Sequence, residues 1–529
     1  MPKIATNNRF YFVLYGMCCL LYILFFGPYG FEDTDTGYIF GTSWNIYNGI
    51  LPHRDFIYTR PAIPAFVHTL FLYVSETYGY LLDRAFFYVQ IFVYSLLTLK
   101  IINHKINLGT SLNTYLLALM GAIFSIHNYP PMGWNTTDGV FFWILGVYFI
   151  FNKEKKWFWF FGSLFLVLGT LSKQSFFFMP LFLVGFLIYF KERERIKFVF
   201  LFTLFWVGCY LVLKHTSNSL LPMWEQIFNR TGGSALIEAS IKPYYLALKN
   251  NLLWVMISFL IIFISKKWLP KELTFLLIIT AIALYFAKWY VSQPSFKVVP
   301  NITQIMLLFS GVVFSIKFLK NKNYGILLFL LLLSWSASIS NGYRTPILYA
   351  TPLLLGIYLF LFKESDSFKN KYVPYASIIA LLVAFTIGYQ TPYMDSNRRE
   401  LNKDMGAVFK PLQFIKSDVA TFEKYQELKN LASQYPNFTV LPSMCLAHYL
   451  TKTVNPIGTD WVLDVEINDK SALLLDQLYQ KKVTLFIEKE VTQVYAKENY
   501  SILFAFQNKW QLIEENEYFN IYTPLNKDN

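Results

Sequence analysis

Four carboxylates stand close together near the start of the chain, where they could act as general bases. They are Glu32, Asp33, Asp35 and Asp55, and the first three lie in the aromatic stretch FEDTDTGYIF at 31–40. Acidic groups held close together in such surroundings have perturbed pKa values, as a group that removes a proton near neutral pH requires. The cluster is therefore a candidate site, and the alternative is an ordinary polar loop.

Two arginines follow in the segment PHRDFIYTRPA at 52–62. Arg54 and Arg60 each present a guanidinium group, whose paired donors match the oxygens of a phosphate. Two alternatives remain open for them: contact with lipid headgroups, and a local ion pair between Arg54 and Asp55.

Further polar residues lie much later in the chain. Asp138 begins an apolar segment and could cap a helix there, serve a site, or do both. Lys173 and Gln174 occupy a short turn between two apolar segments, where a lysine is costly unless its amine reaches water or meets an anion. Arg344, in NGYRTP, has the same two interpretations. Three histidines on the predicted outer side of the membrane lack a metal-ligand spacing and are interpreted as polar filler: His53, His68 and His127.

The elements that must position these residues are mostly membrane helices. Of the 529 residues 55% are hydrophobic and 15% are charged, well below the charge of a soluble protein. Apolar runs long enough to be read as spans, about 13 in all, occur at 10–28, 79–99, 112–128, 139–152, 157–171, 176–190, 198–213, 250–265, 273–287, 302–316, 324–340, 345–362 and 372–390.

The distribution of charge predicts the topology. Up to residue 390 the chain has 31 Lys and Arg against 15 Asp and Glu, and beyond it 15 against 18. The basic excess therefore belongs to alternate loops of the membrane part, which places the N-terminus in the cytoplasm, and it does not indicate nucleic-acid binding. The basic loops all stay on the cytoplasmic side only if 61–76 lies at the membrane interface without crossing and 157–190 crosses the membrane twice.

Two domains follow from this organisation. Residues 1–390 form a transmembrane domain whose first outer loop, 29–78, contains the interfacial helix 61–76. Residues 391–529 form a small α/β domain outside the plasma membrane, with a helix from 404 to about 434, strands at 438–441 and 483–488, a helix at 471–481 and a hairpin at 510–522. The four cysteines have neither disulfide nor metal spacing.

The spacing of the first outer loop resembles that of a known family. Asp35-Thr-Gly-Tyr38 is followed by Gly49, Pro52, Arg54-Asp55-Phe56 and Arg60-Pro61. This pattern resembles the GT-C superfamily of membrane glycosyltransferases, in the branch of the protein O-mannosyltransferases and lipid A aminoarabinose transferases. The resemblance covers essentially the whole chain, and the overall layout carries more of it than any single motif.

The resemblance implies the GT-C fold and a polyprenyl-phosphate-sugar donor. It implies that Asp35 is the general base, with Asp33 as the alternative, because Asp35 is followed by Thr36 where the family commonly has Glu. Asp138 matches a second acidic position, and Lys173-Gln174 matches a Lys-Gln pair. Asp33-Thr-Asp35 also forms the DxD triplet that binds a divalent metal in other glycosyltransferases. Members with monophosphate donors generally work without metal, so no metal or other cofactor is expected.

The predicted function is transfer of a sugar to a glycan, lipid or protein acceptor on the outer side of the membrane, with inversion at the anomeric carbon. Membrane lipids are expected partners. The leaving phosphate would be neutralised by Arg54, Arg60, Lys173 and Arg344. Three alternatives remain: a transporter or flippase of lipid-linked solutes, a glycan polymerase or ligase, and a noncatalytic scaffold. No internal repeat of the kind that transporters show is evident.

Overall fold

The computed structural model describes most of the chain. The described residues are 8–32, 34–106, 108, 111–127, 131–152, 157–190, 195–217, 220–228, 233–292, 301–340, 346–362, 372–390, 395–490 and 495–525. Two of the candidate site residues from the sequence, Asp33 and Arg344, lie outside these ranges.

Every apolar run contains one helix, so the α-helical character of this part of the chain is confirmed. The helices are α1 (Asn8–Phe25), α4 (Gly79–Lys105), α5 (Ser111–Ile126), α6 (Asn135–Phe151), α7 (Trp157–Thr170), α8 (Met179–Tyr189), α9 (Arg195–Ser217), α12 (Leu252–Trp268), α13 (Lys271–Ser292), α14 (Asn301–Lys320), α15 (Gly325–Ser338), α16 (Thr351–Leu361) and α17 (Tyr372–Gln390). Short 3-10 turns η2 (Gln174–Phe176), η3 (Lys322–Tyr324) and η4 (Pro346–Tyr349) stand before α8, α15 and α16.

Within the described ranges three helices, α4, α9 and α14, are long and apolar enough to cross a membrane. A fourth span is formed if α11 (Gly233–Asn250) and α12, which meet at a 70° bend, count as one. Eight further apolar helices have 10–17 residues. At 1.5 Å per residue these are about 15–26 Å long, less than the roughly 30 Å of a hydrocarbon core. The count of about 13 full spans therefore stays a prediction.

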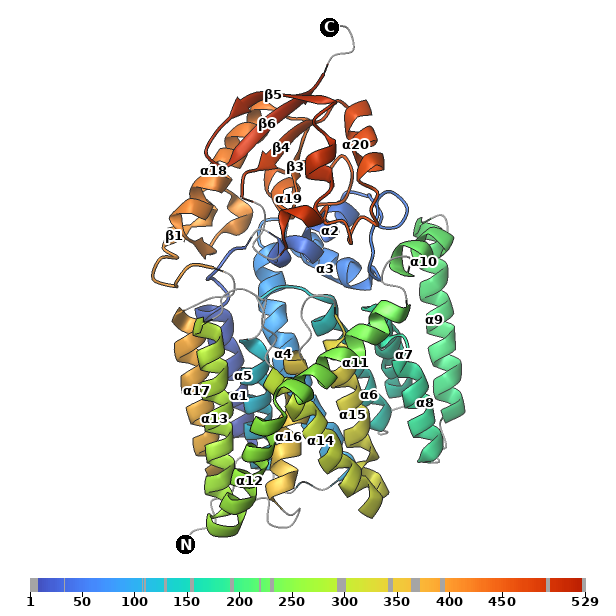
Figure 1. The fold of residues 1–529 in the computed structure, drawn as a ribbon. Helices are drawn as coiled ribbons and strands as arrows, with labels where there is room; N and C mark the ends of the chain where they lie inside the picture. The colour runs from blue at the N-terminus through green and yellow to red at the C-terminus, as the bar shows by residue number, and fades with distance from the viewer. Residues whose placement is uncertain are drawn as a thin grey trace.

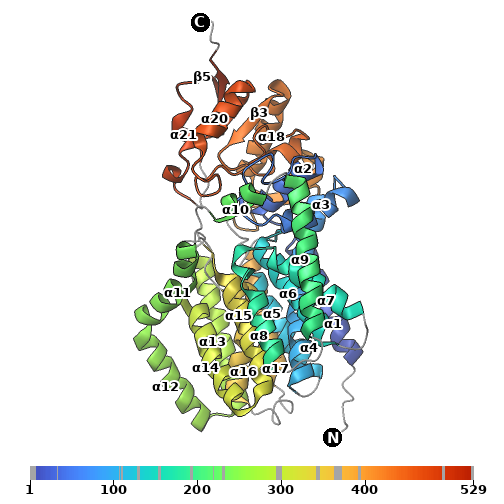
Figure 2. The same cartoon turned by 90° about the vertical axis from the view of Figure 1, so that its right-hand side faces the viewer.

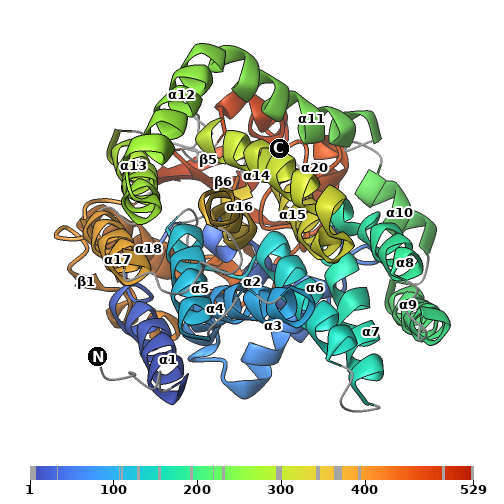
Figure 3. The ribbon, with the colours of Figure 1, turned by 90° about the horizontal axis from the view of Figure 1, so that it is seen from below.

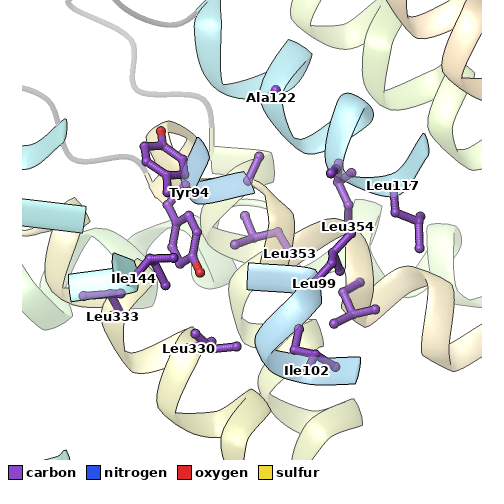
Figure 4. Close-up of a cluster of buried hydrophobic side chains, with 14 of the residues drawn as sticks. Tyr94, Leu99, Ile102, Leu117, Ala122, Ile144, Leu330, Leu333, Leu353 and Leu354 are labelled. Carbon is purple, nitrogen blue, oxygen red and sulfur yellow. The ribbon is translucent and has the colours of Figure 1, made fainter. Parts of the chain in front are cut away.

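The helices pack around a central apolar core (Figures 3 and 4). Tyr94 and Leu99 of α4, Leu117 of α5, Leu330 of α15 and Leu353 of α16 are all buried in one cluster. α12 lies at the rim in Figures 2 and 3 and has no buried residue. The core thus gives a fixed support to the turns at the ends of α4, α6, α7 and α15.

The first outer loop folds over one end of these helices (Figure 1). It contains the short turn η1 (Asp35–Gly37), α2 (Tyr38–Tyr47) and α3 (Ile63–Val74). α3 has 12 residues, about 18 Å, and is a separate short helix where the sequence predicted one at 61–76. α2 was not predicted, and neither were α10 (Leu220–Phe228) and α11 in a later connection.

The C-terminal part is a small α/β domain, as the sequence predicted. Its sheet has the order β3-β4-β6-β5, with β3 and β4 parallel and the other pairs antiparallel. The strands are β3 (Phe438–Leu441), β4 (Thr484–Glu488), β5 (Trp510–Glu515) and β6 (Phe519–Pro524), and the helices are α18 (Val419–Gln434), α19 (Ala447–Thr451), α20 (Ser471–Gln480) and α21 (Ile502–Ala505), with the turn η7 (Lys497–Asn499). The predicted strands, helix and hairpin are confirmed.

The predicted helix from 404 to about 434 is wrong in its first half. Strands β1 (Lys403–Asp404) and β2 (Lys416–Ser417) pair there, with turns η5 (Met405–Ala407) and η6 (Lys410–Leu412) between them. α18 begins only after Asp418, whose carboxylate accepts the backbone N–H of Thr421 at 2.7 Å. This cap marks a true helix start, and Pro411 prevents an earlier helix from passing through.

The first outer loop and the C-terminal domain share their cores. Tyr38 and Ile39 of α2 lie in one buried cluster with Trp461, and Phe40 and Trp44 lie in another with Tyr449. Gly37 and Gly41 let α2 approach closely: a Cβ at Gly41 would overlap the Cys445 carbonyl oxygen, and one at Gly37 the Leu446 side chain. The two segments therefore fold as one unit although about 400 residues separate them.

Candidate active site

Arg60 lies at the junction of the first outer loop, α6 and the C-terminal domain. Its guanidinium carbon stands 4.3 Å from the centre of the Tyr38 ring and 4.9 Å from that of Trp134. Its Nη2 donates to Glu466 Oε1 at 2.5 Å. The arginine side chain is 19% exposed and the glutamate 9%. The aromatic rings and the carboxylate together hold the guanidinium plane in one orientation.

The second terminal nitrogen of Arg60 has no such partner. Nη1 is buried and makes no hydrogen bond to any of the residues that the structure describes. Burial opposes the charge of Arg60, but the carboxylate of Glu466 outweighs this and raises the pKa of the arginine. Arg60 therefore stays charged, with one strong donor unused. A buried donor without a partner costs about 1–3 kcal/mol, so the position favours an anionic ligand.

Lys173 supplies a second cation close to Arg60. It stands in the turn between α7 and α8, where its extended backbone separates the two helices. Its Nζ donates to Thr136 Oγ1 at 2.9 Å and to the Ala337 carbonyl at 3.1 Å. Burial, and next the positive charge of Arg60, lower the pKa of Lys173 to about 7. An anion between the two cations would relieve this repulsion.

Gln174 and Asn135 tie the segments around these cations to one another. Gln174 Nε2 donates to the Thr59 carbonyl at 2.7 Å, directly before Arg60. Asn135 Nδ2 donates to the Ser172 carbonyl at 2.7 Å, directly before Lys173. The structure thus brings together three of the residues that the sequence singled out, Arg60, Lys173 and Gln174.

Asp35, the expected base, begins the short turn that leads into α2. The Glu32 carboxylate accepts the backbone N–H groups of Thr34 at 2.8 Å and of Asp35 at 2.7 Å, so Glu32 shapes the turn. The Asp35 side chain is buried. It lies near Cys445: burial raises the pKa of that thiol, and the charges of Asp460, Glu32 and Asp35 add to the effect. Which of Asp33 and Asp35 is the base stays a prediction.

Arg54 and Asp55 bind each other. Arg54 Nη2 and Nε donate to the two carboxylate oxygens of Asp55 at 2.6 and 2.9 Å, and Asp55 also accepts the backbone N–H of Leu51 at 2.7 Å. About a third of each side chain is exposed. This local pair is one of the alternatives that the sequence left open, and a phosphate contact for Arg54 stays a prediction.

Asp138 belongs to a fully buried cluster around His68. Its carboxylate lies 3.2 Å from His68 Nε2 and accepts a hydrogen bond from Gln90 Nε2 at 2.6 Å. On the other side, His68 Nδ1 contacts Asp83, which also accepts the backbone N–H of Gly133 at 3.0 Å. Asp138 makes no hydrogen bond as a helix cap. The role that the sequence analysis gave it in the site stays a prediction.

The interpretation of His68 as polar filler is wrong. Burial alone would lower its pKa, but the charges of Asp138 and Asp83 outweigh burial and raise it to about 10. The charged form of His68 is thus favoured by the carboxyl groups of Asp83 and Asp138, and the residue links α3, α4 and α6. Its ring lies where a side chain on Gly133 would stand, so it also supports the segment that carries Trp134.

Sequence reasoning missed Glu466 altogether. It lies in the tail, in the apolar segment VLDVEIN, and the described residues that its side chain binds are all about 400 residues away. A carboxylate between Val465 and Ile467 was the available signal, because an acid among apolar residues needs a partner.

No metal-binding group appears among the residues that the structure describes. Three or more His, Cys, Asp or Glu side chains nowhere gather there in a way that could hold an ion. Asp33, half of the DxD triplet, lies outside those residues, so the expectation about metal stays untested.

Comparison with known proteins identifies similar structures. No protein-family model matches the chain, and no curated protein matches it. The structure is similar to that of ArnT from Cupriavidus metallidurans in the apo state, with 9% identity, a TM-score of 0.43 and 98% of each chain covered. It is also similar to the same protein bound to undecaprenyl phosphate, with 8% identity, a TM-score of 0.46 and coverage of 98% and 99%. ArnT is an aminoarabinose transferase of the GT-C family. At these identities the similarity assigns no residue a role.

Proposed function

We propose that this protein is a GT-C glycosyltransferase that transfers a sugar from a polyprenyl-phosphate donor to an acceptor on the outer side of the membrane. The observation that carries the proposal is the pair of cations at the ends of the apolar helices. Arg60 has a buried, unused donor, and Lys173 lies beside it in the turn between α7 and α8. A lipid-linked phosphate would enter there from the bilayer with its chain still among the helices.

In the proposed reaction the acceptor attacks the anomeric carbon of the donor sugar. A bond forms between the acceptor oxygen or nitrogen and that carbon, while the bond from the carbon to the phosphate oxygen breaks. The bonding electrons leave with the polyprenyl phosphate, where Arg60 and Lys173 neutralise the growing negative charge. The acceptor proton passes to Asp35, or to Asp33 in the alternative assignment. Direct displacement inverts the configuration at the anomeric carbon.

The remaining parts of the proposal follow from the sequence. Arg344 is a further phosphate contact. The protein lies in the inner membrane, with its N-terminus in the cytoplasm and its C-terminal domain on the outer side. The acceptor is a glycan, a lipid or a protein. No metal is assigned a step.

The first test is binding of undecaprenyl phosphate to the protein in lipid nanodiscs. Arg60→Gln removes the charge and the unused donor, so the dissociation constant should rise about tenfold to a hundredfold, the loss of one charge-assisted hydrogen bond. The matched control is Arg398→Gln, because Arg398 is a buried arginine that likewise lies on an aromatic ring, 3.5 Å above that of Tyr29, yet has no place in the site. Equal binding by wild type and Arg60→Gln would refute the phosphate assignment.

Transfer itself is measured with polyprenyl-phosphate sugars in the same discs, by mass spectrometry of the released polyprenyl phosphate. Asp35→Asn should lower the rate by a factor of about 10² or more, as loss of a general base does. Full activity of Asp33→Asn, Asp35→Asn and the double variant would exclude both as the base. Lipid-linked intermediates that accumulate when the protein is deleted would name the sugar.

A further inference from the structure

We infer that Glu466 of the C-terminal domain is a positioning residue for donor binding. It holds Arg60 so that Nη1 is presented to the phosphate. The inference rests on the proposed function and adds that the outer domain completes the phosphate site.

Among the residues that the structure describes, the side-chain hydrogen bonds of Glu466 are all made with the first outer loop. Oε1 accepts Arg60 Nη2 at 2.5 Å, and Oε2 accepts Thr59 Oγ1 at 2.7 Å and the Tyr38 hydroxyl at 3.2 Å. Thr59 precedes Arg60 in the chain, and Tyr38 provides the ring against which the guanidinium lies. One carboxylate therefore fixes the arginine, its neighbour and its stacking partner together.

The effect on Arg60 is to divide its two terminal nitrogens between two tasks. Nη2 is used by Glu466, and Nη1 is left without a partner among the described residues. An arginine side chain has many conformations, and holding it in one of them before the ligand arrives reduces the entropy lost on binding. Without Glu466 the buried guanidinium would have no counterion here and would lose this orientation.

Glu466 can act in this way because its own backbone is rigidly held. Its N–H donates to the Leu463 carbonyl at 2.7 Å, and Leu463 and Ile467 on either side are buried in the core of the C-terminal domain. Two residues on, Asn468 Nδ2 donates to the Gln226 carbonyl of α10 at 3.3 Å. The turn is thus anchored both to its own domain and to a helix of the membrane part.

The charges also fit a phosphodiester. Arg60 and Lys173 bring two positive charges, and Glu466 brings one negative charge. A phosphodiester with one negative charge would make the group neutral, whereas the empty site has an excess positive charge when Lys173 is protonated. Glu466 lowers the net positive charge of the group, so what it adds to phosphate binding is the orientation of Arg60 and not electrostatic attraction.

The experiment measures undecaprenyl phosphate binding and donor kinetics for Glu466→Gln in the full-length protein. The amide has the size of the acid and can still accept from Thr59, but it lacks the charge that orients Arg60. We expect the dissociation constant and the KM for the donor to rise about tenfold, with kcat within about threefold. The melting temperature should also fall, because the substitution breaks a buried ion pair. The matched control is Glu488→Gln: Glu488 is also buried, and it pairs with Lys424 at 2.7 Å inside the C-terminal domain.

A double variant separates positioning from general damage to the fold. If Glu466 acts through Arg60, Glu466→Gln should weaken binding in the wild type but add no further loss to Arg60→Gln. Equal losses in both backgrounds, or no loss in either, would overturn the inference while Arg60 keeps its role. If Arg60→Gln itself has no effect, the phosphate assignment fails, and the positioning role fails with it.

Discussion

Lys173 is the residue whose charge depends most directly on its surroundings. Its amine is held by Thr136 and the Ala337 carbonyl, and neither of these is negatively charged. Burial and the proximity of Arg60 lower its pKa to about 7. Because a lysine is charged only below its pKa, the free protein loses this positive charge as the pH rises through about 7. A bound phosphate would favour the charged form and raise the pKa in the complex.

Donor affinity should therefore fall with rising pH. Above pH 7 the dissociation constant for a polyprenyl-phosphate sugar should increase up to about tenfold per pH unit, until the pH reaches the pKa of Lys173 in the complex. A phosphodiester donor is the suitable probe because it does not titrate in this range. Binding measured from pH 6 to 9 tests this, and Lys173→Arg should flatten the profile. A pH-independent wild type would show that Lys173 does not contact the phosphate.

For individual residues of the site, the sequence predicts the cations better than the groups that bind them. Arg60, Lys173 and Gln174 could be found because polar residues next to apolar segments need a reason to be there. Glu466 could not be paired with Arg60, since hydrogen bonds across 406 residues follow no periodicity. The pairing of His68 with Asp83 and Asp138 was missed in the same way, since the two carboxylates come from two other helices.

Among the elements, α2 shows how the loop is joined to the C-terminal domain. Gly37, Gly41 and Asn45 follow at intervals of four and share one face of the helix. That face meets Leu446, the Cys445 carbonyl and, through Asn45 Nδ2, the Gly458 carbonyl at 2.9 Å. Only a residue without a side chain fits against the Cys445 backbone.

A matched pair of glycine substitutions tests this contact. Gly41→Ala should destabilise the protein by about 1–3 kcal/mol, because the new methyl group overlaps a backbone oxygen that cannot easily move. Gly16→Ala in α1 should be neutral or stabilising by up to about 1 kcal/mol, because nothing lies within 4 Å of its Cβ position and alanine favours a helix. Thermal unfolding in detergent measures both. A Gly41→Ala variant as stable as Gly16→Ala would contradict the packing of α2.

The predictability of an element depends on its apolar content. Each long apolar run contains a helix, and composition alone is enough to predict it, because a long apolar segment in a membrane protein is stable there as a helix. α2 is interrupted by Gly, Thr, Ser and Asn, so its burial against the tail could not be read from local pattern. The segment 404–417 has helix-like spacing, yet Pro411 and the cap at Asp418 divide it into a strand pair with turns.

In the whole molecule, the boundary between the two domains in the sequence does not separate two units that unfold independently, because the first outer loop and the C-terminal domain share their cores. The first outer loop lies against the C-terminal domain (Figure 1), and the two bury apolar side chains together in two clusters. Residues that share a core open together, since neither part keeps its buried surface when the other leaves.

Hydrogen exchange followed by mass spectrometry tests this cooperation. Amides of α2 and of strands β3 and β4 should lose protection together as denaturant is added, with Gly41→Ala accelerating both sets. Two helices of the central core, α5 and α16, should exchange independently of that variant and serve as an internal control. Fast exchange of α2 beside a fully protected sheet would show that the loop folds alone.

The ion pair between Arg60 and Glu466 also has a consequence for biosynthesis. Its two halves are separated by 406 residues, and chains grow at about 5–20 residues per second, so the loop reaches its destination roughly 20–80 seconds before its partner is made. During that interval the loop has no carboxylate for Arg60 and no surface for α2. A ribosome must therefore pass residue 466 before the proposed phosphate site is complete, and a product terminated earlier would lack the residue that positions Arg60.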